Sequence, residues 1–159
     1  MPTEISGATG VNKVQTGAIE TGDMPTGSVL QAVESTSLDT TYITSTSFQD
    51  IDLNITITPS STSSKVLVMA DFGHTQDGGS NHDAWIQLVR GSTAITGTGH
   101  RVGYDTAGGD VGFGCHIQKL DAPNTTSATT YKVQARTSNA SSQFRPHGGA
   151  SIIAMEIAG

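Results

Sequence analysis

The run IDLNITIT at residues 51–58 alternates strictly between apolar and polar side chains. A period of two places every second side chain on the same face of a β-strand, so one face is buried and the other meets water. Pro59 and the serine-rich run 60–64 end this strand, because proline lacks the donor that a sheet needs and serine favours turns. The next run, KVLVMADF at 65–72, is apolar on both faces for most of its length. This pattern is typical of a central strand in a sandwich, or of a strand that faces a partner subunit.

Further strand candidates lie on both sides of this pair, at 28–33, 41–48, 83–90, 93–97, 110–120, 129–137 and 150–157. In 110–120 one face carries Val111, Phe113, Cys115 and Ile117, and the other carries Gly112, Gly114, His116 and Gln118. In 129–137 the inward residues are Tyr131, Val133 and Ala135, and the outward residues are Lys132, Gln134 and Arg136. No window of 11 residues keeps a helical period. Roughly nine short strands separated by turns predict an all-β chain, an antiparallel β-sandwich or jelly roll.

Composition excludes several classes of protein. The 159 residues include 23 Thr, 17 Ser and 19 Gly, and only 14% are charged, so a coiled coil or helical bundle is not expected. The net charge of -6 argues against a nucleic-acid partner. No apolar run is long enough to span a membrane, and residues 1–4 do not resemble a signal peptide, so no membrane insertion is expected. The single cysteine, Cys115, allows no internal disulfide.

Residues 1–26 differ from the rest of the chain. Their apolar side chains are too sparse to build a core, and four glycines interrupt any helix. Because apolar residues still recur, we expect an extended N-terminal arm that docks on another protein, ahead of a jelly-roll domain at 27–159; a loosely ordered terminus is the alternative. The docking residues expected in this arm are Ile5, Val11, Val14 and Ile19.

Five strings of residues, taken in order, resemble one family. They are GSVLQ at 27–31, ITPSSTSSKVLV at 57–68, LVRGSTAI at 88–95, APNTTSATTYKVQ at 122–134 and IAMEI at 153–157. As a set they resemble the C-terminal domain of tailed-bacteriophage fibre proteins of the aquatic phage type. The resemblance covers about residues 27–158. It implies a trimeric jelly roll like that of tumour necrosis factor or C1q, displayed on the virion and associated with host attachment.

The chain departs from this family in two respects. Such fibres often carry the domain at the end of a long shaft, whereas here only residues 1–26 precede it. The loops expected at 73–83 and 97–110 match none of the family's strings, so no receptor is implied. Two hypotheses follow: a virion fibre protein that recognises the host surface, or a structural virion component such as a capsid decoration, head-fibre, collar or baseplate protein.

Side chains that carry chemistry are scattered. His74, Asp77, His82 and Asp83 could supply metal ligands from one loop, but their spacing matches no known metal motif, so no metal or other cofactor is expected. The chain has no G-x-S-x-G elbow, and Cys115 alternates with apolar residues as a core residue does, so we expect no enzyme. Glycines 112 and 114 share one strand face, which allows either close approach of a partner backbone or a bend.

Recognition is expected in the two loops, because loops vary while the strands hold them in place. The candidate receptor-binding residues are His74, Asp77, His82, Asp83, His100, Arg101 and Tyr104. Fixed donors and aromatic faces suit a host surface glycan. Trp85 is a further aromatic candidate, but it lies in the apolar run AWIQLV at 84–89, so a core or interface position is favoured for it.

Overall fold

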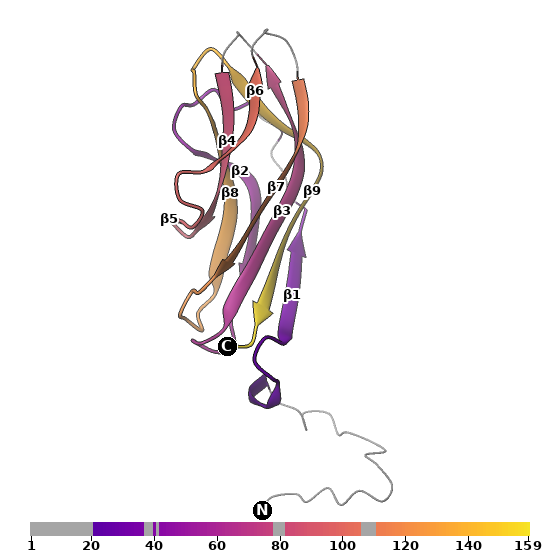
Figure 1. Cartoon of the computed structure of the whole chain (residues 1–159), viewed down its shortest axis with the longest axis vertical. Helices are drawn as coiled ribbons and strands as arrows, with labels where there is room; N and C mark the ends of the chain where they lie inside the picture. Colours follow the sequence, from indigo (N-terminus) through magenta and orange to yellow (C-terminus); the bar gives the residue numbers. More distant parts are fainter. Residues whose placement is uncertain (1–20, 37–39, 41, 78–81, 106–110) are drawn as a thin grey trace, which may run out of the picture.

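The computed structural model describes residues 21–36, 40, 42–77, 82–105 and 111–159. Nearly all regular structure in these residues is β-strand (Figure 1). The elements are η1 (Thr21–Asp23), β1 (Val29–Ser35), β2 (Gln49–Ile57), β3 (Lys65–Asp77), β4 (His82–Arg90), β5 (Thr93–Ala94), β6 (His100–Asp105), β7 (Val111–Asp121), β8 (Thr129–Thr137) and β9 (Gln143–Ile157). None of the described residues forms a helix long and apolar enough to cross a membrane.

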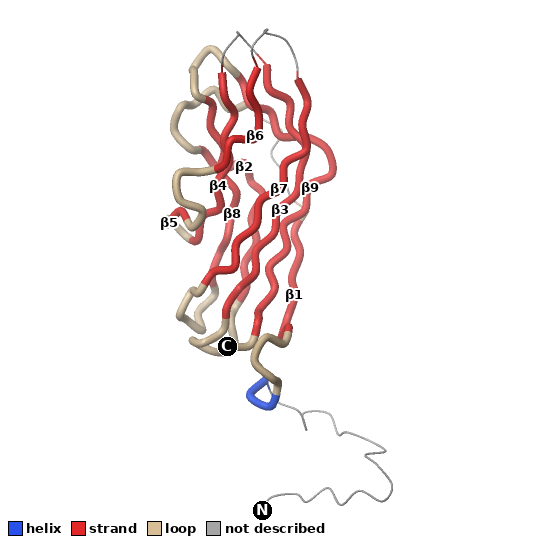
Figure 2. The backbone as a smooth tube through the Cα atoms, in the orientation of Figure 1, coloured by secondary structure: helices blue, strands red, loops and turns tan. Residues whose placement is uncertain are grey.

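The strands form two antiparallel sheets packed face to face (Figure 2). The first sheet has the order β1-β9-β3-β7. The second sheet has the order β2-β8-β4, with β4 pairing further to β5 and to β6. Leaving out the two-residue β5, eight strands divide four and four between the sheets, and most connections cross from one sheet to the other. This is the arrangement of a jelly roll, and it confirms the predicted fold class.

The alternating run at 51–58 behaves as its pattern predicts. Ile51, Leu53, Ile55 and Ile57 point into the sandwich and are at most 5% exposed. β3 lies between β9 and β7, which confirms that 65–72 is a central strand. Its even-numbered residues Val66, Val68, Ala70 and Phe72 face the core.

The core lies between the two sheets and takes side chains from both. Cys115 and Ile117 of β7 are 2% exposed, and Tyr131, Val133 and Ala135 of β8 are fully buried, as predicted. Phe113 shares their face but lies 39% exposed near the end of the sandwich. Burying an aliphatic side chain contributes about 1.5–3 kcal/mol, so this layer is the main source of stability.

Two of the strand predictions were wrong. The strand predicted at 41–48 is absent from its described residues, 42–48: Ile43 makes an isolated bridge to Phe144, and the backbone N–H of Ser47 donates to Ser45 Oγ at 3.0 Å. Serine hydroxyls that bond to the nearby backbone favour a bend, and here the chain passes from one sheet to the other. Conversely, part of the loop predicted at 97–110 forms a strand: residues 100–105 pair with β4, after a turn at Gly97 and Gly99, which have positive φ.

The N-terminal arm expected at 1–26 lies largely outside the described residues, including Ile5, Val11, Val14 and Ile19. η1 sits at the same end of the sandwich as the C-terminus (Figure 1). β1 then begins after a turn in which the Gly27 N–H donates to the Ala158 carbonyl at 2.8 Å. The opposite end of the sandwich is where β3 ends and β4 begins.

Candidate functional site

His74 and His82 do not lie in a solvent-exposed loop, so this part of the predicted recognition loop was wrong. β3 continues to Asp77 and β4 starts at His82, which leaves only 78–81 of the predicted loop 73–83, outside the described residues. The His74 side chain is fully buried and that of His82 is 1% exposed. The alternation that buries Phe72 simply continues through His74 and Gln76. The two-residue period continues in the sequence, but His74 and Gln76 are polar, so it does not appear there as an alternation of apolar and polar residues.

These residues form a buried polar cluster near one end of the sandwich. His74 Nδ1 lies 3.0 Å from Cys115 Sγ, and the imidazole stacks on Phe144 and Phe113 with ring centroids 4.8 and 5.5 Å away. The Gln76 amide donates to the His82 carbonyl at 2.8 Å. Three polar atoms of this cluster have no hydrogen-bond partner among the described residues: His74 Nε2, Gln76 Oε1 and His82 Nε2.

Burial makes this cluster chemically quiet at neutral pH. Burial, with a smaller repulsion from His147, lowers the pKa of His74 from its ordinary value of 6.5 to about 4. Burial, with the negative charge of Asp71, raises the pKa of Cys115 to about 12. A thiol with a raised pKa is a poor nucleophile. Among the described residues, no group of three or more His, Cys, Asp or Glu side chains is placed to hold a metal ion.

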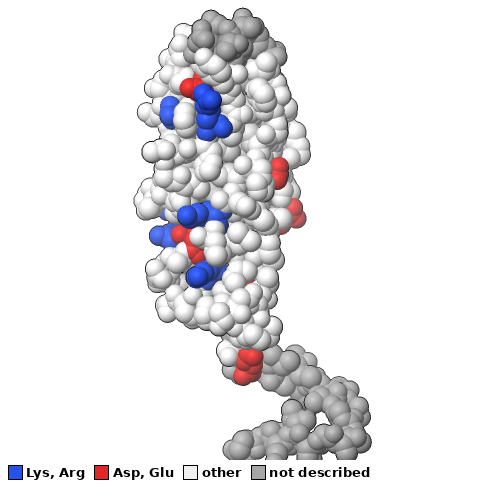
Figure 3. Space-filling model, viewed as in Figure 1, with Lys and Arg blue, Asp and Glu red and all other residues white. Residues whose placement is uncertain are grey.

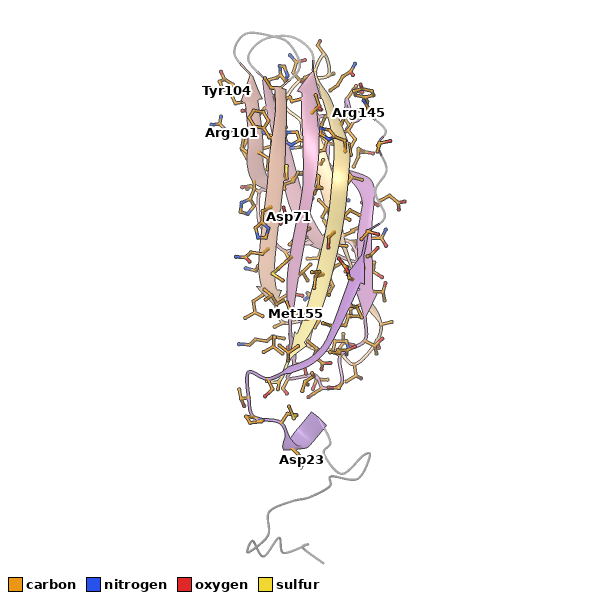
Figure 4. The ribbon with its side chains drawn as sticks, turned by 90° about the vertical axis from the view of Figure 1, so that its right-hand side faces the viewer. Asp23, Asp71, Arg101, Tyr104, Arg145 and Met155 are labelled. Atoms are coloured by element: carbon orange, nitrogen blue, oxygen red, sulfur yellow. The ribbon has the colours of Figure 1, made fainter. Side chains whose placement is uncertain are left out.

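Three of the predicted recognition residues do meet on the surface. Arg101 of β6 donates from Nη1 to Asp83 Oδ1 of β4 at 3.0 Å, and its guanidinium lies 5.2 Å from the centre of the Tyr104 ring. Arg101 and Tyr104 are both labelled near one end of the molecule in Figure 4. His100 is exposed on the same strand but pairs with Ile86, farther from this group. The Asp77 side chain lies outside the described residues.

This group continues across the outer face of the second sheet as an arginine–aromatic row. Trp85 of β4 is in register with Arg101 on one side and with Arg136 of β8 on the other. Phe48 is the next residue in the row. Its neighbour Gln49 pairs with Ala135 in antiparallel register, so Phe48 comes opposite Arg136. The Arg136 guanidinium lies 5.2 Å from the Phe48 ring centre and 5.1 Å from that of Trp85. The row is Arg101, Trp85, Arg136 and Phe48, one residue from each of four adjacent chain segments.

Sequence reasoning found only part of this row. It placed Arg136 on the outward face of its strand but gave it no role, and it did not single out Phe48. Trp85 is half-buried on the outer face of the second sheet, so a position in the core was wrong for it. The two-residue period of a strand could have placed Trp85 correctly. Trp85 has an odd number, so it lies on the face opposite to the buried Ala84, Ile86 and Leu88.

The outer face of the first sheet is apolar over half its length. Cross-strand pairing lines up Leu120, Leu67 and Met155, and in the next row Gln118, Met69 and Ile153. Leu120 is 48% exposed and the other apolar side chains of this face are half-buried. Figure 4 looks onto this sheet and labels Met155 near one end and Asp71 near the middle. We call the residues Leu67, Met69, Leu120, Ile153 and Met155 the apolar face.

Two shallow hollows accompany these surfaces. One, of about 130 Å³, lies on the first sheet between Met69, Ile153 and the hydrogen-bonded pair of His116 Nδ1 and Asp71 Oδ2, which are 2.7 Å apart. The other, of about 290 Å³, lies beside β2 and is lined by Tyr42–Ser45 and Gln49–Ile51. Asp50, at the edge of this hollow, accepts hydrogen bonds from Lys132 and Gln134. Burial alone would raise the pKa of Asp50, but these two contacts outweigh burial and lower it.

Comparison with known proteins adds little to this description. No family model matches the sequence, and no curated protein matches it. A structure of infectious bursal disease virus, Gx strain, matches with a TM-score of 0.46 and 15% identity over 81% of this chain. A Gt strain structure of the same virus matches with a TM-score of 0.35 and 12% identity over 79%. The chain spans about a third of the length of either. The assignment of the jelly roll rests on this chain's own strand order.

Proposed function

We propose that this chain is a non-enzymatic protein of a bacteriophage virion, a homotrimeric fibre component that takes part in attachment to the host surface. The observation that carries the proposal is the coincidence of two features. The chain has the jelly-roll strand order that its resemblance to phage fibre domains implies. It also has an apolar outer sheet face suited to a second copy.

The apolar face supports self-association. Its five aliphatic and thioether side chains form a continuous patch over three strands, whereas the outer face of the second sheet mixes arginine and aromatic side chains with polar ones. Large exposed apolar patches mark interaction sites, because packing a partner against them removes apolar surface from water, which is favourable. Repeated copies in a ring would also multiply weak contacts to a cell surface.

The chemistry of the described residues supports a binding role without catalysis. The only thiol is buried and its pKa is raised. The buried imidazole of His74 stays neutral above about pH 4, but it faces phenylalanine rings and not a substrate pocket. The exposed groups that do converge, on the outer face of the second sheet, are arginine and aromatic side chains suited to recognition.

Residues 1–26 take the role of the docking arm in this proposal, binding another virion protein. Deleting residues 1–20 should leave the melting temperature of the domain nearly unchanged, because so few apolar side chains add little burial. The same deletion should abolish incorporation into particles, measured by immunoblotting of purified virions. Normal incorporation of the truncated chain would contradict the docking role.

The proposal is tested by adsorption competition together with the position of the chain in the particle. Host cells saturated with the purified 159-residue chain should adsorb fewer particles, and density for the chain should lie at the tail. A matched protein lacking the sandwich, residues 1–26 alone, should not compete. Density on the head lattice with no competition would overturn the fibre role in favour of a capsid decoration protein.

A further inference from the structure

The arginine–aromatic row contains one cation with unused hydrogen-bond donors. The only hydrogen bond of the Arg136 guanidinium among the described residues is a long one, 3.4 Å from Nη1 to the Thr137 carbonyl. No described carboxylate lies within ion-pair distance of it. By contrast Lys132, on the same face of the same strand, lies 2.7 Å from Asp50, and Arg101 lies 3.0 Å from Asp83. A guanidinium carries five donors, so Arg136 keeps most of its capacity.

The surrounding rings fix the orientation of this cation. The Arg136 Cζ atom lies 5.2 Å from the centre of the Phe48 ring and 5.1 Å from the centre of the Trp85 ring, which is cation–π distance. A planar guanidinium held against aromatic rings loses little freedom when it binds, and its donor edge matches a carboxylate with two parallel hydrogen bonds. Arg136 is half-buried, so its charge is also screened less than that of a fully exposed arginine.

Arg101 supplies a second positive charge on the same line. Trp85 separates the two arginines, and neighbouring strands lie about 4.7–4.9 Å apart, which places their backbones roughly 10 Å from each other. The Arg101 guanidinium also pairs with Asp83 through Nη1. In the view of Figure 3, Lys and Arg side chains gather in two groups, each with acidic side chains among them, in a chain whose net charge is -6.

We propose that the row Arg101, Trp85, Arg136 and Phe48 binds an acidic polysaccharide of the cell surface through sugar carboxylates, with Arg136 as the principal contact. The inference deepens the proposed attachment function and rests on it. The planar guanidinium of Arg136 matches a sugar carboxylate with two parallel hydrogen bonds, and the polyphosphate and DNA arms of the experiment below test whether phosphate binds instead. Three copies in a trimer raise the avidity for a repeating polymer.

The experiment measures binding of the 159-residue chain to size-defined oligogalacturonate by calorimetry. Neutral dextran, polyphosphate and single-stranded DNA serve as comparison ligands. The variants are Arg136→Gln, Arg136→Lys and Arg101→Gln. Lys132→Gln is the matched control, because it removes the same charge from the same strand face. The melting temperature of each variant reports whether its fold is intact.

Binding of oligogalacturonate by the wild type, weakened roughly tenfold or more by Arg136→Gln, is the expected result, since charge-assisted hydrogen bonds are the strong ones. Arg136→Lys should also weaken it, because lysine lacks the bidentate fork. Lys132→Gln should change it less than about twofold, as a screened surface charge does. Failure of the wild type to bind, equal loss in Lys132→Gln, or tighter binding of polyphosphate or DNA would each overturn the proposal.

Adsorption competition separates this inference from the function on which it rests. If wild-type chain competes with particles for host cells and the Arg136→Gln chain competes equally well, attachment stands and the row is not the binding site. If neither competes, the attachment function itself fails. Loss of competition in Arg136→Gln with retention in Lys132→Gln supports both.

Discussion

The imidazole of His74 and the thiol of Cys115 lie 3.0 Å apart, Nδ1 to Sγ, in the interior between the two sheets. Both side chains are at most 2% exposed, and neither carries a charge at neutral pH. A polar pair in an apolar layer stabilises the fold only in its neutral form, because a buried charge without a counter-ion is strongly disfavoured. The interior near the end of β3 is therefore sensitive to acid.

We predict that His74 makes stability depend on pH between about 6.5 and 4. Its pKa falls from 6.5 in the unfolded chain to about 4 in the folded one, so the unfolded chain binds the extra proton in this window. Stability is complete above pH 6.5 and falls by about 3 kcal/mol as the pH drops to about 4. Urea unfolding at fixed protein concentration should show this slope.

The variant His74→Gln should flatten that slope, even where it lowers stability at every pH, since an amide does not titrate. The exposed His100→Gln is the control and should keep the wild-type slope. An unchanged slope in His74→Gln would assign the acid sensitivity to other groups.

The variant Gly103→Ala should destabilise the fold by about 1–3 kcal/mol, as overpacking of a tight interior does. A methyl group at residue 103 would meet Gln76 Oε1, and would lie 3.2 Å from His74 Nε2 and 3.4 Å from Phe113 Cε2. Gly114→Ala is the matched control, because nothing lies within 4 Å of its added methyl. Chemical denaturation should separate the two, and equal stability would show that the interior has room at Gly103.

Charges on the apolar face should prevent assembly of the proposed trimer and leave the jelly roll folded. Met69 and Met155 point away from the core, so Met69→Lys combined with Met155→Lys removes no core contact but introduces repulsion at the proposed interface. Light scattering should give a trimer for wild type and a monomer for the double variant. Thr56→Lys, exposed on the second sheet, should remain trimeric. A wild-type monomer at micromolar concentration would refute the assembly.

The variant Glu156→Gln should lower the free energy of unfolding by about 1–3 kcal/mol. Although burial disfavours its charge, the Glu156 carboxylate accepts from Gln31 Nε2 at 2.6 Å and from Ser60 N and Oγ at 2.7 Å, and these bonds lower its pKa. The stabilisation is therefore fully present above the ordinary glutamate pKa, and it is lost as the pH falls from there through the lowered pKa of the folded chain. The exposed Glu34→Gln, measured in parallel by thermal unfolding, should cost less. Equal costs would mean that the carboxylate does not fasten the β2–β3 turn to β9.

The sequence by itself determined the class of fold and the orientation of most strands. Alternation in 51–58 and 129–137 depends only on the two-residue period of an extended backbone, so it predicts which side chains face the core before any pairing is known. The same two-residue period places His74 on the core-facing side of its strand, although a histidine is not expected in an apolar interior. The run at 65–72 is apolar on both faces, which indicates a strand that packs against other residues on both sides.

Only the tertiary structure decided which surface residues lie together. Phe48, Trp85, Arg101 and Arg136 are far apart in sequence, and they form a row because of the register between β8 and β4 and between β4 and β6. A shift of one residue in either pairing would turn a strand's side chains to the opposite face. Register is set by the packing of the whole core, which no local pattern contains, and so the candidate recognition surface could not be derived from any single segment.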